Sequence, residues 1–302
     1  MKRPHALISS LLLLLTNAAG AIPPQTATAQ PSLDARIHAE VAAFKGTVSL
    51  FAKNLDTGVA YSLNGDNRVR TASTIKVAIM VEAFARVAEG KAKWTDEVVL
   101  TDAKKVTGSG VLQDLHDGLK LTLRDAVTLM MTVSDNTATN LVLDVVTTDA
   151  VNARMDAMGL KQTRVLRKIG SGGTSRAGED PALKPFGLGV TTPHEMAMLL
   201  ETIERGEVVS PAASKEMIAL MKREQHRDGI GRAIVDTEMA TKAGALDRLR
   251  SDIGIIYTKT GRIVMAITCD DMPDIVWSED NPGYLMLSRL SRILIESLGR
   301  AR

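Results

Sequence analysis

A serine and a lysine three residues apart stand at the start of an apolar stretch. Ser73 and Lys76 lead into residues 77–87, a mostly apolar run that predicts a buried helix ending near Gly90. Positions three apart share one helix face, and a buried lysine is costly unless it is paired or loses its proton. A proton-accepting lysine beside a serine hydroxyl makes that serine a nucleophile. The alternative role for Ser73 is that of a plain N-cap at the helix start.

A second polar cluster, Ser134-Asp135-Asn136, lies between two predicted helices. A serine in this position can pass a proton to a leaving group, and the amide of Asn136 can bind a substrate amide. All three residue types also favour helix N-caps, which is the structural alternative for the cluster. Because a given tripeptide is rare by chance at average composition, its place at a helix junction downstream of Ser73 favours a catalytic role.

The order of these two motifs, followed by a lysine on a late strand, resembles that of class A β-lactamases and penicillin-binding proteins. The similarity covers nearly all of the chain from the first predicted helix to the last, and includes residues 121–125 before the second motif. The resemblance to the class A β-lactamase family implies an acyl-enzyme on Ser73, with Lys76 as base or base partner and Ser134 as proton shuttle. It implies no cofactor and no metal.

Two segments compete for the lysine-containing third motif. The literal Lys259-Thr260-Gly261 lies between two predicted strands, where Thr260-Gly261 favours a hairpin turn with its side chains in solvent. Lys242-Ala243-Gly244 ends a predicted strand and precedes residues 250–254, which are similar to the family's next strand. We therefore expect Lys242, and not Lys259, to lie in the site.

The resemblance also implies how the Lys242 segment binds substrate. The backbone N–H of Ala245, after Gly244, would join that of Ser73 as an oxyanion hole. The family usually carries a hydroxyl residue where this chain has Ala243, and that hydroxyl binds the substrate carboxylate. Losing one hydrogen bond to a charged group costs roughly 1.5–3 kcal/mol.

Positive charge for the substrate carboxylate is expected from two basic residues. By similarity, Lys242 and Arg250 would hold the carboxylate together, and Arg248 is the alternative to Arg250.

Release of the acyl group requires a carboxylate that activates water, which the family places in a loop after the second motif. The corresponding segment here is residues 178–184, where the family pattern resembles Glu-Pro-x-Leu-Asn. Alignment on the proline puts Asp180 at the catalytic position, and Asp180 is one methylene shorter than glutamate. Glu179 would serve if the loop shifted by one residue. In the alternative interpretation both acids face solvent.

Hydrophobic periodicity predicts strands at both ends of the chain and helices in the middle. The segment 168–189 is expected to be a long functional or mobile loop. The fold class is therefore α+β, an antiparallel sheet flanked by N- and C-terminal helices with an inserted all-helical subdomain. Within the catalytic domain 32–302, residues 32–72 and 230–302 form the α/β part and 73–229 the helical part. The predicted strands are 47–53, 59–63, 238–242, 253–258 and 263–269, and the predicted helices are 32–43, 77–87, 122–133, 136–146, 149–158, 284–298 and two that begin near Thr192 and Ser210.

The first 21 residues have the features of a secretory signal peptide. Lys2 and Arg3 precede an apolar core that is too short to span a bilayer, and small residues allow cleavage after Ala21 or Ala29. Residues 22–31 are expected to be a flexible leader. These features predict a periplasmic or secreted protein without an integral membrane segment after signal removal.

Composition excludes several other classes of function. Removing Lys2 and Arg3 with the signal takes the formal net charge from +2 to zero, which gives no electrostatic basis for nucleic-acid binding. The single cysteine, Cys269, cannot form an internal disulfide. The histidines are scattered without metal-ligand spacing, so metal catalysis has little support; they are His5, His38, His116, His194 and His226.

Three functions remain open. The first is an exported serine hydrolase that opens β-lactam rings, in which Asn136 and a loop carboxylate position the hydrolytic water. The second is a penicillin-binding D-Ala-D-Ala peptidase-like enzyme, or a slow acyl-enzyme former, acting on peptidoglycan-like substrates. The third is a non-catalytic binding protein on the same fold. A monomer is expected in each case.

Overall fold

The computed structural model describes residues 31–170 and 173–299. Contacts divide the chain into residues 1–32 and residues 33–302, and the fold below is that of the second unit. The predicted signal peptide 1–21 and both of its cleavage sites lie outside the described residues. Within the described ranges, no helix has the length and apolar character needed to cross a membrane.

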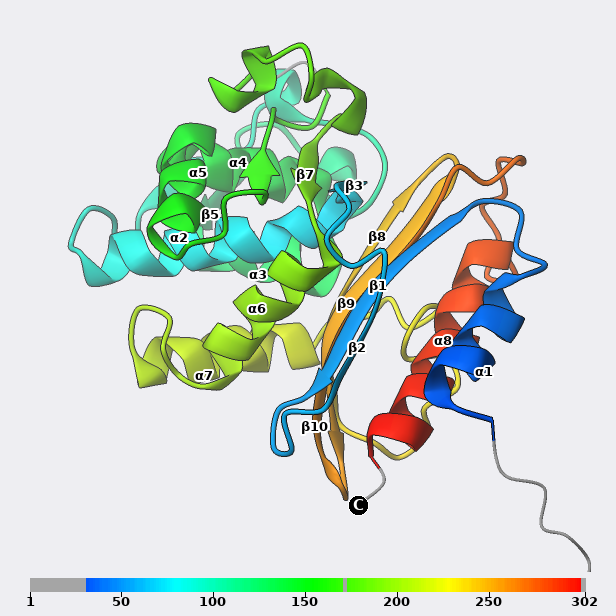
Figure 1. The fold of residues 1–302 in the computed structure, drawn as a ribbon. Coiled ribbons are helices and arrows are strands. Elements are labelled where there is room, and N and C mark those ends of the chain that lie inside the picture. The colour runs from blue at the N-terminus through cyan, green and yellow to red at the C-terminus, as the bar shows by residue number, and fades with distance from the viewer. Residues whose placement is uncertain (1–30, 171–172, 300–302) are drawn as a thin grey trace, which may run out of the picture. The chain divides into compact units, whose positions relative to one another are not determined.

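A five-stranded antiparallel sheet forms the centre of this unit, with the strand order β2-β1-β10-β9-β8 (Figure 1). The first strand of the chain pairs with the last one, from Thr47 opposite Asp270 to Asn54 opposite Ile263. In the described part of the chain, β8 is an edge strand with β9 as its only sheet neighbour. The strands are β1 (Thr47–Asn54), β2 (Ala60–Leu63), β8 (Met239–Leu246), β9 (Leu249–Thr258) and β10 (Gly261–Asp270).

The sheet is apolar on both faces because helices cover both of them (Figure 1). Successive side chains of a strand point to opposite faces, so Met265 and Ile267 of β10 pack on one side and Val264 and Ala266 on the other. The first side is covered by the two terminal helices, α1 (Leu33–Val41) and α8 (Pro282–Leu298). The predicted α+β class with flanking terminal helices is confirmed.

The other face of the sheet carries the helical part of the unit. Its central helix is α2, which contacts α3, α4 and α5 and is buried from Lys76 to Ala85. A helix surrounded in this way must be apolar on all sides, as its sequence is. The helices are α2 (Lys76–Ala88), α3 (Leu123–Thr132), α4 (Asn136–Val146), α5 (Thr148–Ala157), α6 (Pro193–Glu204) and α7 (Pro211–Lys222).

Side-chain caps fix where these helices begin. Thr122 and Asp125 form the reciprocal capping box that the sequence predicted at the start of α3. Thr192 and Ser210 cap α6 and α7, each followed by a proline at the first helical position. These local signals explain why most helix boundaries agree with the prediction to within two residues.

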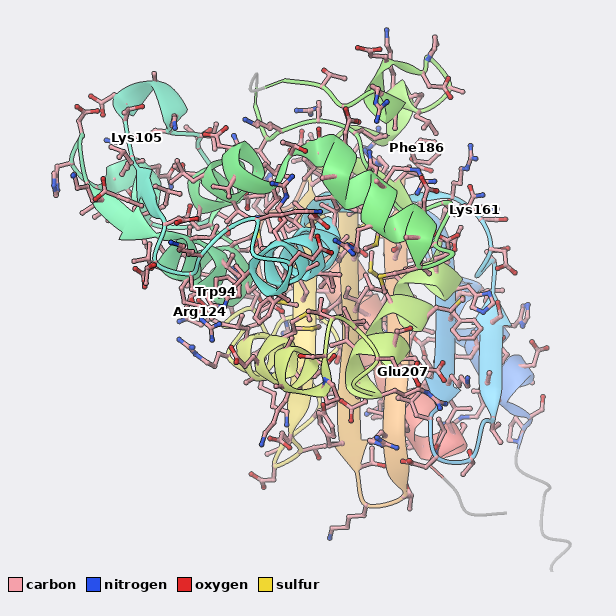
Figure 2. All side chains as sticks on the ribbon, turned by 90° about the vertical axis from the view of Figure 1, so that its left-hand side faces the viewer. Trp94, Lys105, Arg124, Lys161, Phe186 and Glu207 are labelled. Carbon is pink, nitrogen blue, oxygen red and sulfur yellow. The ribbon has the colours of Figure 1, made fainter. Side chains whose placement is uncertain are left out.

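The outer end of the helical part is closed by a cation stacked on two aromatic rings. The Arg124 guanidinium lies 5.0 Å from the centre of the Trp94 ring and 5.6 Å from that of Phe84, and Figure 2 labels Arg124 and Trp94 next to each other. Such contacts stabilise by about 0.5–1 kcal/mol at exposed positions. They attach the start of α3 to the segment that leads into a two-stranded sheet, β4 (Glu97–Val99) and β5 (Lys120–Thr122).

The predicted long loop is an excursion between two short strands, β6 and β7. Asn140 on α4 anchors it, since its side chain donates to Ile169 O (2.9 Å) and accepts from Ile169 N (3.0 Å). The buried hydroxyl of Ser175 donates to Val165 O (2.8 Å). The remaining elements are β3 (Val69–Arg70), β6 (Arg164–Val165), β7 (Gly189–Thr191), and the 3-10 turns η1 (Ala72–Ile75), η2 (Asp102–Lys104), η3 (Leu112–Asp114), η4 (Ala177–Glu179) and η5 (Lys184–Phe186).

Candidate active site

Ser73 lies in the 3-10 turn η1 that leads into α2, and the α-helix itself begins at Lys76. Lys76 is therefore the first residue of the α-helix, one position before the predicted start at residue 77. Ala72, just before the serine, has a φ of 46°, a left-handed conformation that is uncommon outside glycine and concentrates at functional sites. The side chain of Ser73 is half-buried and makes no cap, so the N-cap alternative does not hold.

Lys76 is fully buried and has only neutral hydrogen-bond partners. Its Nζ donates to Ser134 O (2.6 Å), Ser134 Oγ (3.1 Å) and Asn136 Oδ1 (3.0 Å). Burial lowers the pKa of Lys76 well below its ordinary value, and the nearby charge of Lys242 lowers it further. The amine is therefore suited to accept a proton, since no carboxylate bonds to it and holds it in the charged form.

In the second motif, Asp135 caps a helix, whereas Ser134 and Asn136 contact Lys76. Asp135 is the N-cap of α4, where one carboxylate oxygen accepts from Ala138 N (2.8 Å) and the other from Val111 N (2.7 Å). Ser134 has a left-handed φ of 54°, and both Ser134 and Asn136 face Lys76. The capping alternative thus holds for Asp135 alone.

The outer edge of β8 lies directly against the turn that carries Ser73. A Cβ atom on Gly244 would lie 2.9 Å from Ser73 N and 3.0 Å from Thr71 O, so only glycine allows this approach. The backbone of Ala245 continues the same edge. Two backbone N–H groups, of Ser73 and Ala245, are thereby placed on adjoining elements, as an oxyanion hole requires.

Lys242 is also fully buried, and it is ion-paired with Glu224, a residue that the sequence analysis missed. The Lys242 ammonium bonds to Glu224 Oε1 and donates to Ala243 O (3.0 Å). Both oxygens of Glu224 also accept from Ala243 N (3.0 Å each). Glu224 lies just after α7, and no sequence motif surrounds it. The only indication in the sequence was its position after the apolar face of a helix, where an acidic side chain would have to be buried.

Arg250 lies between two aromatic rings. Its guanidinium is 4.7 Å from the Trp277 ring centre and 4.9 Å from that of Tyr284. It donates to the carbonyls of Leu246 (2.6 Å), Leu249 (2.7 Å) and Val276 and is fully buried, which lowers its pKa. Arg248, the alternative, is exposed and bonds to the carbonyl of Met272.

These elements enclose a cavity of about 510 Å³, within the usual size range for small-molecule sites. It is lined by Ser73, Ser134 and Asn136, as the motif analysis expected, and by the Ala243–Ala245 edge. Lys76, Lys242 and Arg250 lie behind this wall. The other lining residues, which the sequence analysis did not select, are Gly108, Ser109, His226, Trp277 and Tyr284.

Lys259 and its literal Lys-Thr-Gly triplet lie elsewhere. The triplet forms the turn between β9 and β10, where Lys259 is exposed and Thr260 O accepts from the side chain of Asn54 (3.3 Å). It does not line the Ser73 cavity.

Comparison with known proteins identifies the family to which this geometry belongs. The sequence model of the β-lactamase enzyme family matches residues 32–298. The chain belongs to the class A β-lactamase family. A solved β-lactamase from Sphaerobacter thermophilus is 33% identical, with a TM-score of 0.77 over 89% of this chain and 97% of that one.

Two other family relatives differ in what their names describe. Beta-lactamase CARB-3 from Pseudomonas aeruginosa is 29% identical over 63% of this chain, and the match spans 65% of that enzyme's length, just under two thirds. The solved structure of PBP-A is 25% identical, with a TM-score of 0.77 over 89% of this chain and 98% of that one. The resemblance inferred from the motifs is confirmed at the level of the family and the fold.

The loop acids of this β-lactamase relative lie apart from the cavity wall. Glu179 and Asp180 are both exposed, and an Asp180 oxygen accepts from Ala182 N (2.9 Å) within the loop itself. Neither lines the Ser73 cavity, and no other Asp or Glu is among its lining residues in the described parts of the chain.

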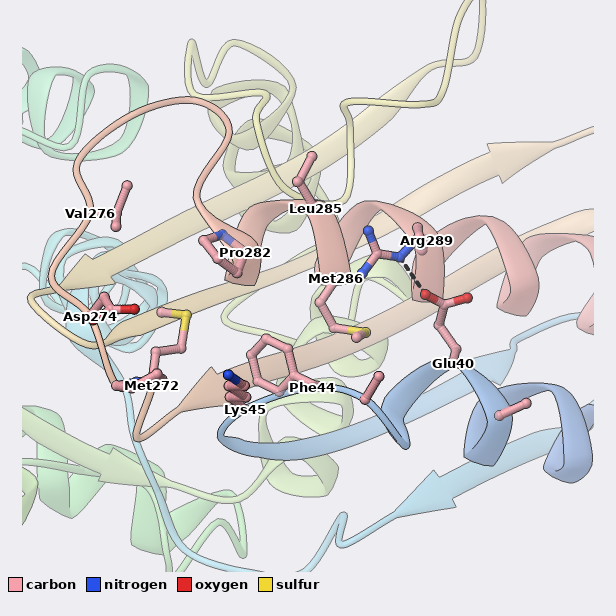
Figure 3. A pocket seen from close by; sticks show the side chains of 13 residues that line it. Glu40, Phe44, Lys45, Met272, Asp274, Val276, Pro282, Leu285, Met286 and Arg289 are labelled. Carbon is pink, nitrogen blue, oxygen red and sulfur yellow. Dashed lines mark hydrogen bonds and ion pairs between the residues drawn. The ribbon is translucent and has the colours of Figure 1, made fainter.

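A second cavity, of about 530 Å³, lies at the other face of the sheet between α1, α8 and residues 272–276 (Figure 3). Phe44, Met272 and Met286 make it apolar, and an ion pair between Glu40 and Arg289 lies at its edge. Its lining residues carry no hydroxyl, thiol or imidazole, and its ionisable side chains are those of Glu40, Lys45, Asp274 and Arg289. None of the three sequence motifs contributes a residue to this second cavity.

The described residues hold no metal site and no reactive thiol. No cluster of three or more His, Cys, Asp or Glu side chains with the potential to bind a metal occurs within 31–170 and 173–299. Cys269 is buried on β10, and burial raises the pKa of its thiol.

Proposed function

We propose that this protein is a serine enzyme that opens β-lactam rings through an acyl-enzyme on Ser73. The observation that carries the proposal is the fully buried Lys76, which has only neutral partners and a lowered pKa and lies one turn from Ser73. An amine in this state accepts the hydroxyl proton as the serine attacks.

The proposed reaction moves one proton and exchanges one bond. Ser73 Oγ forms a bond to the lactam carbonyl carbon while its proton passes to Lys76. The N–H groups of Ser73 and Ala245 stabilise the oxyanion. Ser134, bonded to Lys76 Nζ (3.1 Å), then hands the proton to the lactam nitrogen as the C–N bond breaks.

The charged groups behind the wall act on substrate from a distance in this proposal. Lys242 is covered by Ala243 and neutralised by Glu224, and Arg250 is covered by the rings of Trp277 and Tyr284. Arg250 is thus a positioning residue for the two aromatic lining groups, and Lys242 holds the β8 edge that Ala243, Gly244 and Ala245 present.

We propose that the acyl-enzyme is released slowly. Water attack needs a general base within reach of the ester, whereas Glu179 and Asp180 are exposed and outside the cavity wall. This observation favours a second candidate function, a penicillin-binding, D-Ala-D-Ala peptidase-like enzyme. The likeness to PBP-A is in keeping with it.

Time-resolved intact mass of the mature protein with a penicillin and a cephalosporin tests the proposal. A transient adduct with substrate consumed establishes a β-lactamase, whereas a stable adduct establishes the penicillin-binding function. Ser73→Ala is the control and must give no adduct. No adduct on the wild-type protein, or one that persists in Ser73→Ala, overturns the proposal, and the former result points to a non-catalytic binding protein.

The cellular location belongs to the same proposal. The basic start, short apolar core and small cleavage-site residues of the first 21 positions support export to the periplasm or medium. Detection of a mature chain beginning after Ala21 or after Ala29 in the exported fraction tests this part.

A further inference from the structure

Three basic side chains surround the Ser73 cavity, and the protein itself satisfies the hydrogen-bonding groups of each. Lys76 donates to Ser134 and Asn136, Lys242 is paired with Glu224, and Arg250 donates to three carbonyls between two rings. All three basic side chains have no exposed surface, and none lines the cavity. An anionic group of a bound substrate therefore contacts none of them directly.

His226 differs from these three residues in its exposure, in its position and in its lack of bonded partners. It is exposed, it lines the cavity, and its side chain has no hydrogen-bond or ion-pair partner among the described residues. It is also the only residue of the described wall with a basic side chain. Its imidazole carries at least one N–H donor in either protonation state.

The backbone on both sides of His226 is fixed. Gln225 N donates to Thr132 O (2.9 Å), which attaches the segment to the end of α3 just before Ser134. On the other side, the guanidinium of Arg227 donates to Glu224 O (3.1 Å) and Lys222 O (2.9 Å) at the end of α7. These bonds anchor the segment that presents the imidazole to the cavity, as a binding group requires.

The β8 edge of the cavity lacks the hydroxyl group with which the family usually binds an anion. Ala243 stands where the family usually has a hydroxyl, and its N–H is already taken by Glu224. We propose that His226 binds the carboxylate of the substrate in place of that hydroxyl and of Arg250, and so selects acyl donors with a free carboxylate beside the scissile amide. This inference rests on the proposed acylation of Ser73 for its choice of substrate class.

The test compares an acid with its ester. On a Ser73→Ala background, where no acylation interferes, calorimetry gives the dissociation constants of benzylpenicillin and of its methyl ester. His226→Ala should weaken binding of the acid about tenfold, the value of a charge-assisted hydrogen bond, and leave that of the ester unchanged. His226→Gln, which keeps an N–H donor, should restore most of the loss. His38→Ala, an exposed histidine on α1, is the matched control.

Equal losses for acid and ester, or no loss for either, overturn the role of His226. The proposed function is judged separately, by adduct formation in the protein with Ser73 intact. If Ser73 forms no adduct while the acid still depends on His226 for binding, the reaction is wrong and the binding group is right. If the adduct forms and His226→Ala affects the acid and the ester alike, the reaction is right and the role of His226 is wrong.

Discussion

Lys76 and Lys242 are buried to the same extent, on neighbouring elements around one cavity, yet they have opposite partners. Lys76 bonds to a carbonyl, a hydroxyl and an amide oxygen, all neutral. Lys242 is paired with the carboxylate of Glu224. A buried amine without a counter-charge favours its neutral form, whereas an ion pair favours the charged form. Partner choice therefore assigns two different tasks to one residue type.

The two lysines are also electrostatically linked. The charge of Lys242 lowers the pKa of Lys76, and the charge of Glu224 raises it. Burial is the largest cause of the lowered pKa, and the charge of Lys242 is the second. A substitution that changes the charge of the Lys242–Glu224 pair should therefore also change the pKa of Lys76.

The largest expected effect comes from removing the amine that has neutral partners. Lys76→Met should slow acylation of Ser73 by about a thousandfold, within the range for loss of a general base. It should leave the fold intact, because methionine has a similar length to lysine and Lys76 has no ion-pair partner that would be left buried without its counter-charge. Stopped-flow acylation with a chromogenic cephalosporin measures the rate. Lys259→Met, in the exposed literal triplet, is the matched control, and an equal loss there would refute the assignment of motifs.

The next largest effect concerns the ion pair. Glu224→Gln keeps an acceptor for Ala243 N but leaves the buried Lys242 without a counter-charge, which should lower the free energy of unfolding by about 3–5 kcal/mol. Urea denaturation measures the loss.

The double variant Lys242→Met, Glu224→Gln should recover much of that stability, because no unpaired charge remains buried. If the single variant is as stable as wild type, the pair is not formed in solution and the contrast between the lysines fails.

A third prediction uses pH. Asp252, on β9 near this ion pair, is fully buried, and burial followed by the charge of Glu224 raises its pKa to about 8. Between pH 4 and 8 the folded protein binds a proton that the unfolded chain releases, so stability falls as pH rises through this window. Asp252→Asn should remove on the order of 4 kcal/mol of that fall between pH 5 and 8. Thermal unfolding across this range decides, and parallel curves for both proteins would contradict the prediction.

The smallest effect should follow from restoring the family's hydroxyl. Ala243→Thr places a donor on the cavity wall, which should lower the KM for a carboxylate-bearing β-lactam about tenfold with little change in kcat. The Lys76 side is untouched by this substitution. A change confined to kcat would mean that the β8 edge acts on the chemistry and not on binding.

The predictable part of this protein is the part that local chemistry decides. The Thr122–Asp125 capping box, the proline after Thr192 and the period of β10 each depend on neighbours in sequence, and these elements agree with expectation. The strand predicted to end at Lys242 continues to Leu246 as β8, and Gly244 on it allows the close approach to Ser73.

The unpredicted part depends on contacts across the chain. Glu224 forms an ion pair with Lys242, eighteen residues later in the sequence, and no motif indicates this contact. Trp277 and Tyr284 enter the cavity wall because Arg250 stacks between them, a three-way contact that no periodicity encodes. His226 was one of several histidines scattered along the sequence. Its position in the cavity wall follows only from the folded structure.

The pairing of β1 with β10 has a consequence for the order in which the chain is built. During synthesis β1 leaves the ribosome early, with only β2 as a neighbour, and a lone two-stranded hairpin is marginally stable in water. β10, the other strand that pairs with β1, emerges after nearly every other element. The helical part is complete by then, so β1 keeps the edge that β10 will cover unpaired for most of translation. Such a strand is a target for chaperones and for aggregation until residues 261–270 arrive.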